Sequence, residues 1–175
     1  NIMGLIPQIF HDKKPDDGRD YIRILGRVNN KRIYKYIRRD YVKDVDNLDW
    51  YKVYVAQANG SGEFGETMSE SVVEGPGVGS TETFLSVGKF ETIEEARAVE
   101  KYIKTKFARA LLSVLKVTQN GNKPVWKMIP LQDFTAASDI DWSKSIHEID
   151  LQMYRKYGLS EDEVEFIEAH VKEMA

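Results

Sequence analysis

The chain has 175 residues, of which 42% are hydrophobic and 30% charged, and its formal net charge at pH 7 is −3. This composition is typical of a globular protein and excludes an intrinsically disordered one, and the absence of cysteine excludes disulfides and thiolate metal sites. No apolar run approaches the ~20 residues that span a bilayer, and no signal peptide opens the chain, so we expect a cytoplasmic protein without a membrane partner. Because position 1 is Asn rather than Met, we also expect an excised piece of a longer polypeptide.

Residues 21–37 predict a β-hairpin, with the turn-forming pair Asn29 and Asn30 between two strands of alternating pattern. Isoleucine and valine recur on one face of each strand, whereas the other face is mostly arginine and tyrosine. Interleaved Arg and Tyr side chains suit nucleic acid, because guanidinium groups bind phosphates and rings lie against sugars or bases. They equally suit a sheet edge that is protected by charge.

Three further strands are expected at residues 51–58, 82–90 and 125–130, and a Gly-rich loop at 59–80. This loop begins with Gly60, Gly62 and Gly65 in the spacing G-x-G-x-x-G, which in dinucleotide-binding proteins opens a helix against the pyrophosphate. Gly75 and Pro76 follow and break any such helix, so the dinucleotide interpretation is rejected. A long flexible loop on a rigid scaffold is a common place for recognition residues.

The clearest helical pattern runs from 92 to 114, with Thr92 and Glu95 as a capping box and basic residues away from the apolar face. A second capping box, Ser160 and Glu163, begins a short acidic helix near the C-terminus. The sequence therefore predicts an α+β fold, with a mixed, mainly antiparallel sheet, a long amphipathic helix packed on it and a helical C-terminal extension. We expect the recognition domain to cover residues 1–135 and the acidic extension 136–175.

Charge is strongly segregated along the chain. Residues 19–43 contain nine Lys and Arg against two Asp, a net +7, and residues 97–127 contain eight against one Glu, again +7. From position 139 onward, ten acidic residues oppose four basic ones, a net −6. Basic segments attract polyanions such as nucleic acid, although two solvated basic faces would look the same in the sequence.

Catalytic motifs are missing. Pro15–Asp16 is not followed by an acidic-x-Lys pair, since the one such pair, Asp12 and Lys14, precedes it, so a common nuclease pattern is broken. The five prolines are never adjacent, which excludes the Asn- or Asp-Pro-Pro-aromatic loop of amino-methylating enzymes, and no Walker, G-x-S-x-G or H-E-x-x-H motif occurs. We therefore expect a binding domain without a catalytic site or metal, and detectable cleavage or methylation by this chain alone would revive a hydrolase or transferase interpretation.

Several long stretches, in order along residues 50–174, resemble a known family. They are YKVYVAQANGSGEFGE, STETFLSVGKF, YIKTKFARALLSVLKVTQ, WKMIPLQDF and the tail from Asp139 to Met174. Together they are similar to the C-terminal target-recognition region of bacterial type II restriction-modification proteins, in which an adenine-specific DNA methyltransferase is often fused to an endonuclease. The basic hairpin before them is similar more loosely.

The resemblance implies sequence-specific recognition of double-stranded DNA by this chain, without catalysis and without a cofactor of its own. The parent would be a type II restriction enzyme or site-specific adenine DNA methyltransferase whose other domains bind S-adenosylmethionine and, for an endonuclease, Mg. Those methyltransferase and endonuclease domains of the same polypeptide would be partners beside the DNA. An alternative from another class is a protein-interaction or scaffold module that docks its helical tail on a partner subunit.

The family has no fixed base-reading residues, so the DNA-binding candidates come from charge and hydrogen-bonding capacity. They belong to the hairpin, the Gly-rich loop with the strand after it, the amphipathic helix and a polar turn that follows this helix. These candidates are Arg27, Lys31, Arg32, Arg38, Arg39, Asn59, Ser61, Thr81, Thr83, Lys104, Lys106, Arg109, Gln119, Asn122 and Lys123.

Overall fold

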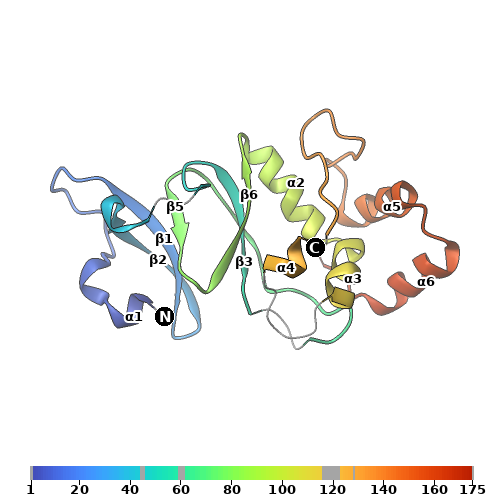
Figure 1. Ribbon diagram of the computed structural model, residues 1–175, viewed down its shortest axis with the longest axis horizontal. Helices are drawn as coiled ribbons and strands as arrows, with labels where there is room; N and C mark the ends of the chain where they lie inside the picture. Colours follow the sequence, from blue (N-terminus) through green and yellow to red (C-terminus); the bar gives the residue numbers. More distant parts are fainter. Residues whose placement is uncertain (1, 44–45, 59–61, 116–122, 128, 175) are drawn as a thin grey trace.

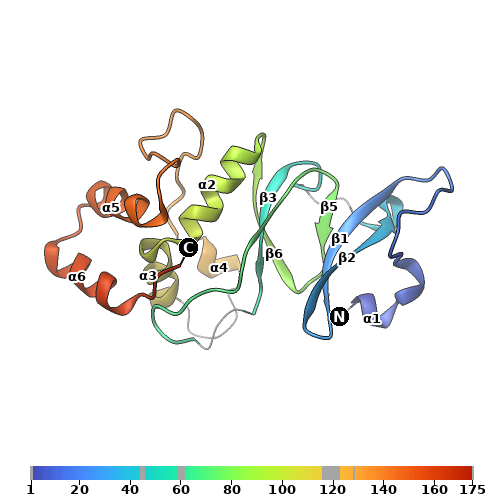
Figure 2. The ribbon, with the colours of Figure 1, turned by 180° about the vertical axis from the view of Figure 1, so that it is seen from behind.

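A computed structural model describes residues 2–43, 46–58, 62–115, 123–127 and 129–174. The elements follow one another along an elongated molecule, with a sheet at each of two successive positions and a group of helices beyond them (Figures 1 and 2). One three-stranded sheet has the order β2-β1-β5 and the other the order β4-β3-β6. The predicted α+β class is confirmed. In the described residues, no helix is long and apolar enough to cross a membrane.

The first sheet is built on the predicted hairpin, β1 (Tyr21–Val28) and β2 (Lys31–Arg38). Asn29 and Asn30 have φ angles of 48° and 64°, the left-handed conformation that a two-residue type I′ turn requires at both positions. The short strand β5 (Val78–Ser80) joins β1 in parallel. One face packs against α1 (Ile2–Leu5) and the 3₁₀ helix η1 (Pro7–Ile9) in a core of Met3, Phe10, Ile22, Ile24, Ile37 and Leu48. A second 3₁₀ helix, η2 (Arg39–Tyr41), follows β2.

The second sheet places β3 (Tyr51–Ala56) between β4 (Val72–Glu74) and β6 (Phe84–Phe90), all antiparallel. A small cluster of Leu25, Tyr54, Val78 and Phe84 joins the two sheets, and the hydroxyl of Tyr54 donates to the carbonyl of Val78 at 2.9 Å. The expectation of an irregular loop over 59–80 is wrong for β4 and β5. Strands of three residues are too short to show a period of two in the sequence.

Lys52 stabilises the region where the two sheets meet. Its side chain is fully buried, and its ammonium group lies 2.7 to 3.0 Å from four carbonyl oxygens, those of Asn47, Leu48, Trp50 and Gly75. A buried ammonium is tolerated only where its protons find acceptors. Lys52 therefore holds the segment before β3 against the turn that connects β4 and β5.

A single helix was expected over 92–114, but the structure has two, α2 (Ile93–Lys104) and α3 (Lys106–Leu115). The prediction of one continuous helix is therefore wrong at Thr105. Thr105 has a ψ of 148°, which breaks the helical path, and its hydroxyl accepts from the amide of Ala108 at 3.1 Å. The carboxylate of Asp150 accepts from the amides of Lys106 at 3.0 Å and Phe107 at 2.8 Å. Three first-turn amides of α3 are thus satisfied from outside the helix.

The remaining helices are α4 (Lys123–Trp126), α5 (Ile146–Tyr157) and α6 (Glu161–His170). The helical α4 overlaps the strand expected at 125–130, which is a wrong prediction: a short apolar run without clear periodicity does not separate helix from strand. The capping boxes at Thr92 and Ser160 are confirmed, and Ser145 with Glu148 forms a third.

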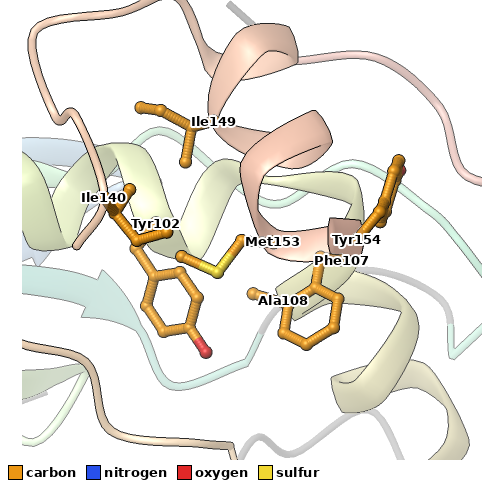
Figure 3. Close-up of a cluster of buried hydrophobic side chains, with 7 residues drawn as sticks. All are labelled: Tyr102, Phe107, Ala108, Ile140, Ile149, Met153 and Tyr154. Atoms are coloured by element: carbon orange, nitrogen blue, oxygen red, sulfur yellow. The ribbon is translucent and has the colours of Figure 1, made fainter. Parts of the chain in front are cut away.

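The C-terminal residues pack into the body of the protein. Ile149, Met153 and Tyr154 of α5 share a buried cluster with Tyr102 of α2 and with α3, and Figure 3 shows Met153 between Tyr102 and the α3 side chains. The other members of this cluster are Phe107, Ala108 and Ile140. The proposed division at residue 135 stays a prediction, but the residues beyond it do not form a detached appendage.

Candidate nucleic-acid interface

Three of the predicted DNA-binding residues, Arg27, Lys31 and Arg32, lie together near the tip of the β1–β2 hairpin. Arg27 lies directly opposite Arg32 across the ladder, and the Nε atom of Arg27 is buried without a hydrogen-bond partner. The guanidinium of Arg32 donates to the backbone carbonyl of Glu70 and lies 5.6 Å from the centre of the Phe84 ring. Among the described residues, no carboxylate forms an ion pair with Arg27, Lys31 or Arg32.

The turn between β5 and β6 lies against this end of β1. The amide of Thr81 donates to the carbonyl of Leu25 at 2.9 Å, and a Cβ atom at Gly26 would lie 3.2 Å from the Thr81 methyl group. The hydroxyls of Thr81 and Thr83 are 2.8 Å apart, and Glu82 adds an exposed carboxylate to the turn. Figures 1 and 2 show the hairpin tip and the β5–β6 turn on the same edge of the molecule. We call Arg27, Lys31, Arg32, Thr81 and Thr83 the turn-end cluster.

The middle of the arginine and tyrosine face is covered rather than open, contrary to the expectation from alternation. Leu25 is fully buried against the second sheet. Next to it, the buried carboxylate of Glu74 accepts from Arg23 at 3.1 Å and from the hydroxyl of Tyr34, while Arg23 lies over the Tyr34 ring at 4.5 Å. Burial and the bond to Glu74 raise the pKa of Tyr34 to about 12. These contacts connect the sheets and pair Arg23 and Tyr34 with a carboxylate of the protein itself.

Arg38 and Arg39 are at the other end of the hairpin and are already paired. Arg38 forms a two-point contact with Asp40, and Arg39 donates to Asp49 at 3.0 and 2.5 Å. These bonds lower the pKa values of both aspartates. Arg38, Arg39 and Arg19 line an open depression of about 540 Å³ together with Asp20 and Asp40. A phosphate here would have to displace carboxylates, so this end is a weaker candidate than the turn-end cluster.

The helical candidates do not form a basic surface. Arg109 is 2% exposed, and its guanidinium donates to the carbonyls of Lys104 at 3.0 Å, Glu66 at 3.1 Å and Lys172. Lys106 is paired with Glu168 at 2.5 Å. The structure therefore does not support a DNA contact by Arg109: helical periodicity placed it outside the apolar stripe, but the segment at Glu66 and the C-terminal residues cover it.

Lys104 lies 3.7 Å from Glu100 one turn earlier on α2. Asn59, Ser61, Gln119 and Asn122 lie outside the described residues, and so does the side chain of Lys123. Their predicted contacts stay predictions.

Sequence reasoning missed two residues that shape this region: Lys52 and Glu74. A lysine in the apolar run YKVYVA was a visible signal that the strand needs internal acceptors, but nothing local indicated which carbonyls supply them. The pairing of Glu74 with Arg23 and Tyr34 joins residues 40 and more positions apart.

In the part of the chain that the structure describes, no group of three or more His, Cys, Asp or Glu side chains could hold a metal ion. Comparison with protein-family models, with curated proteins and with solved structures returns no match. A proposal about function therefore depends on the geometry of the turn-end cluster and on the sequence resemblance.

Proposed function

We propose that this chain is a sequence-specific double-stranded DNA recognition domain of a restriction-modification enzyme, non-catalytic in itself, and that the turn-end cluster contacts the duplex. The observation that carries the proposal is the juxtaposition of Arg27 and Arg32 without a carboxylate partner among the described residues. Like charges directly opposite one another destabilise a β-ladder. A phosphate near them would remove that repulsion and would accept hydrogen bonds from their guanidinium groups.

The neighbouring groups fit the same ligand. Lys31 is exposed at the start of β2, and on the adjoining turn the half-buried Thr83 carries a hydroxyl that is hydrogen-bonded to that of the buried Thr81. Phosphate contacts of this kind fix the orientation of a protein on DNA but do not read its sequence.

The hairpin tip can supply the sequence reading. Asn29 and Asn30 are both exposed, and a two-stranded β-ribbon is narrow enough to enter the major groove. An Asn side chain can bind adenine N6 and N7 together. With the turn-end cluster beside the tip, positioning and reading groups lie on one edge of the molecule.

The experiment that tests this proposal is a selection of the full chain against a randomised duplex library at moderate salt, followed by sequencing of the retained DNA. We expect an enriched motif of a few base pairs. Retention of DNA without an enriched motif would mean that the turn-end cluster is a basic surface that binds DNA without sequence preference. No retention even at low salt would reject DNA binding and favour the alternative, a protein-interaction module. An exposed apolar groove at the helical end gives that alternative some support of its own.

A further inference from the structure

A groove of about 440 Å³ runs between α3 and α6. Leu111 and Val114 of α3 line one wall, Phe166 and Ile167 of α6 line the other, and Phe64 contributes from the segment before β4. The DNA proposal makes no use of this groove, because the first sheet and α6 lie at opposite ends of the molecule in both views (Figures 1 and 2).

Large apolar side chains are left open along the groove. Val114 is 73% exposed, Phe166 is 50% exposed and Phe64 is 38% exposed. The rings of Phe64 and Phe166 are 5.6 Å apart, and Phe166 stacks on His170 at 4.3 Å. Single exposed apolar residues are common on protein surfaces, but a contiguous set that lines a depression marks an interaction site.

The groove is held in shape by contacts behind it. Phe107 forms part of its base and stacks on Tyr157 at 4.9 Å. Glu168 ties α6 to the body by accepting from Lys106 at 2.5 Å and from the hydroxyl of Tyr154 at 2.8 Å. A preformed groove binds an apolar partner without first having to order itself.

The segment that carries Phe64 is fixed as well. Gly65 has a φ of 71°, and a Cβ atom there would lie 2.2 Å from the carbonyl oxygen of His170, so the backbone is in close contact with the end of α6. The amide of Gly65 donates to the hydroxyl of Ser113 at 3.1 Å, and its carbonyl accepts from the amide of Lys172 at 2.9 Å.

The charged residues that line the groove, among those that the structure describes, are acidic. Its acidic lining residues are Asp162 and Glu163, and α6 adds exposed Glu161 and Glu165. No Lys or Arg is among the described residues that line the groove. An occupant that is complementary to this surface has apolar side chains for the base and cationic side chains along its edge.

We propose that the α3–α6 groove is the docking site for an amphipathic helix of a partner protein, with apolar anchors at helical spacing and Lys or Arg beside them. The two walls are helices of ten residues each, about 15 Å long, which suits an occupant of about three turns with anchors at i, i+3 or i+4, and i+7. The acidic side chains of α6 then attract the Lys or Arg side chains along the edge of that helix.

The probe for this test is a synthetic, fluorescently labelled peptide of about four helical turns, with leucine at the anchor positions and lysine elsewhere. A scrambled peptide of the same composition and a peptide with glutamate in place of lysine are the controls. We expect saturable binding of the first peptide to the full chain by fluorescence anisotropy, and weaker binding of both controls.

Two substitutions test whether the peptide binds in the groove. Val114→Gln and Phe166→Gln keep the charge of the protein unchanged, and each should lower the affinity for the leucine–lysine peptide by about tenfold, which corresponds to about 1.4 kcal/mol. Ile6→Gln is the matched control, because Ile6 is 44% exposed beside α1 at the far end of the molecule. It should leave the affinity unchanged, and circular dichroism melts of all variants should show a folded protein.

Charge selection is tested by Asp162→Asn with Glu165→Gln, neither of which closes the α6 capping box. This double substitution should lower the affinity for the lysine peptide and reduce the difference in affinity between the lysine and glutamate peptides. Equal binding of the scrambled peptide, or full affinity in both groove variants, would overturn the proposal. A concentration-dependent dimer that Val114→Gln abolishes, measured by analytical ultracentrifugation, would assign the groove to a second copy of this chain and overturn the partner helix.

Discussion

Arg27 and Arg32 are cross-strand neighbours in the antiparallel register of β1 and β2. Residues in such positions have Cβ atoms about 5 Å apart. Like charges at such paired positions destabilise the ladder unless an anion lies near them. The arrangement is therefore expected to reduce stability in the free protein and to strengthen DNA binding.

The first prediction separates these two effects. Arg27→Met keeps the length of the side chain but removes the repulsion and the buried Nε donor that lacks a partner. We expect the free energy of unfolding to stay the same or to rise by up to about 1 kcal/mol, while the affinity for duplex DNA falls. Urea denaturation and a DNA titration on the same preparation measure both quantities. Loss of stability together with unchanged DNA binding would show that Arg27 has a structural role only.

The second prediction concerns phosphate binding. Arg32→Glu should weaken binding to all duplex sequences alike, and the slope of log affinity against log salt should become shallower by about 0.9 for each phosphate that the variant no longer neutralises. Arg155→Glu makes the same change of charge at an exposed arginine of α5, at the other end of the molecule, and serves as the control. If both variants bind DNA equally, net charge rather than the turn-end cluster determines the affinity.

The third prediction tests the hairpin tip. Asn30→Gly produces the pair Asn-Gly, the most favoured sequence for a type I′ turn, so the hairpin should be as stable as before. It removes the side-chain amide, and if Asn30 reads a base, one position of the selected motif should lose its preference at a cost of about 1 to 3 kcal/mol. Binding to random duplex should not change. Selection with the variant against the randomised library measures the preference, and an unaltered motif would rule out Asn30 as a reading group.

The features that could be predicted from the sequence are those encoded within a few residues. Asn29 and Asn30 specify their turn locally, and the capping pairs Thr92 with Glu95 and Ser160 with Glu163 are only three residues apart. The period of two in β1 correctly identified the apolar face that packs on α1.

The features that could not be predicted depend on distant contacts. The helix break at Thr105 is stabilised by Asp150, 44 residues from Lys106, and Arg109 is buried by carbonyls that lie 43 and 63 residues away. The same limit applies to the candidate site. Composition indicated that the hairpin is basic, but only the fold distinguishes Arg27 and Arg32 from Arg38 and Arg39, which are paired with aspartates.

The fourth prediction concerns the lysine between the sheets. Lys52→Met fits the buried path of the side chain but leaves the carbonyls of Trp50 and Gly75 without this donor. We expect a loss of about 2 to 4 kcal/mol in the free energy of unfolding, because buried acceptors that lose their partner cost about 1 to 3 kcal/mol each. Lys89→Met is the control, since Lys89 is a partly exposed lysine paired with Asp46 at 2.9 Å, and it should cost less than about 1 kcal/mol. Equal losses in chemical denaturation would contradict the role assigned to Lys52.

The last prediction uses pH to examine the carboxylate that begins α3. Burial raises the pKa of Asp150 to about 6, against the lowering effect of its bonds to the amides of Phe107 and Lys106. Between about pH 4 and pH 6 the folded protein thus holds a proton here that the unfolded chain has released. The stabilisation from this proton is complete below about pH 4 and is lost as the pH rises through about 6.

Asp150→Asn removes this titration while it keeps a side-chain oxygen for one amide. The free energy of unfolding of the original protein, minus that of the variant, should therefore fall by about 2 to 3 kcal/mol between about pH 4 and pH 7. Urea denaturation of both proteins at several pH values measures the difference, in which titrations common to both proteins cancel. A difference that rises with pH would mean that the two amide donors outweigh burial, and that Asp150 caps α3 as a fully ionised carboxylate.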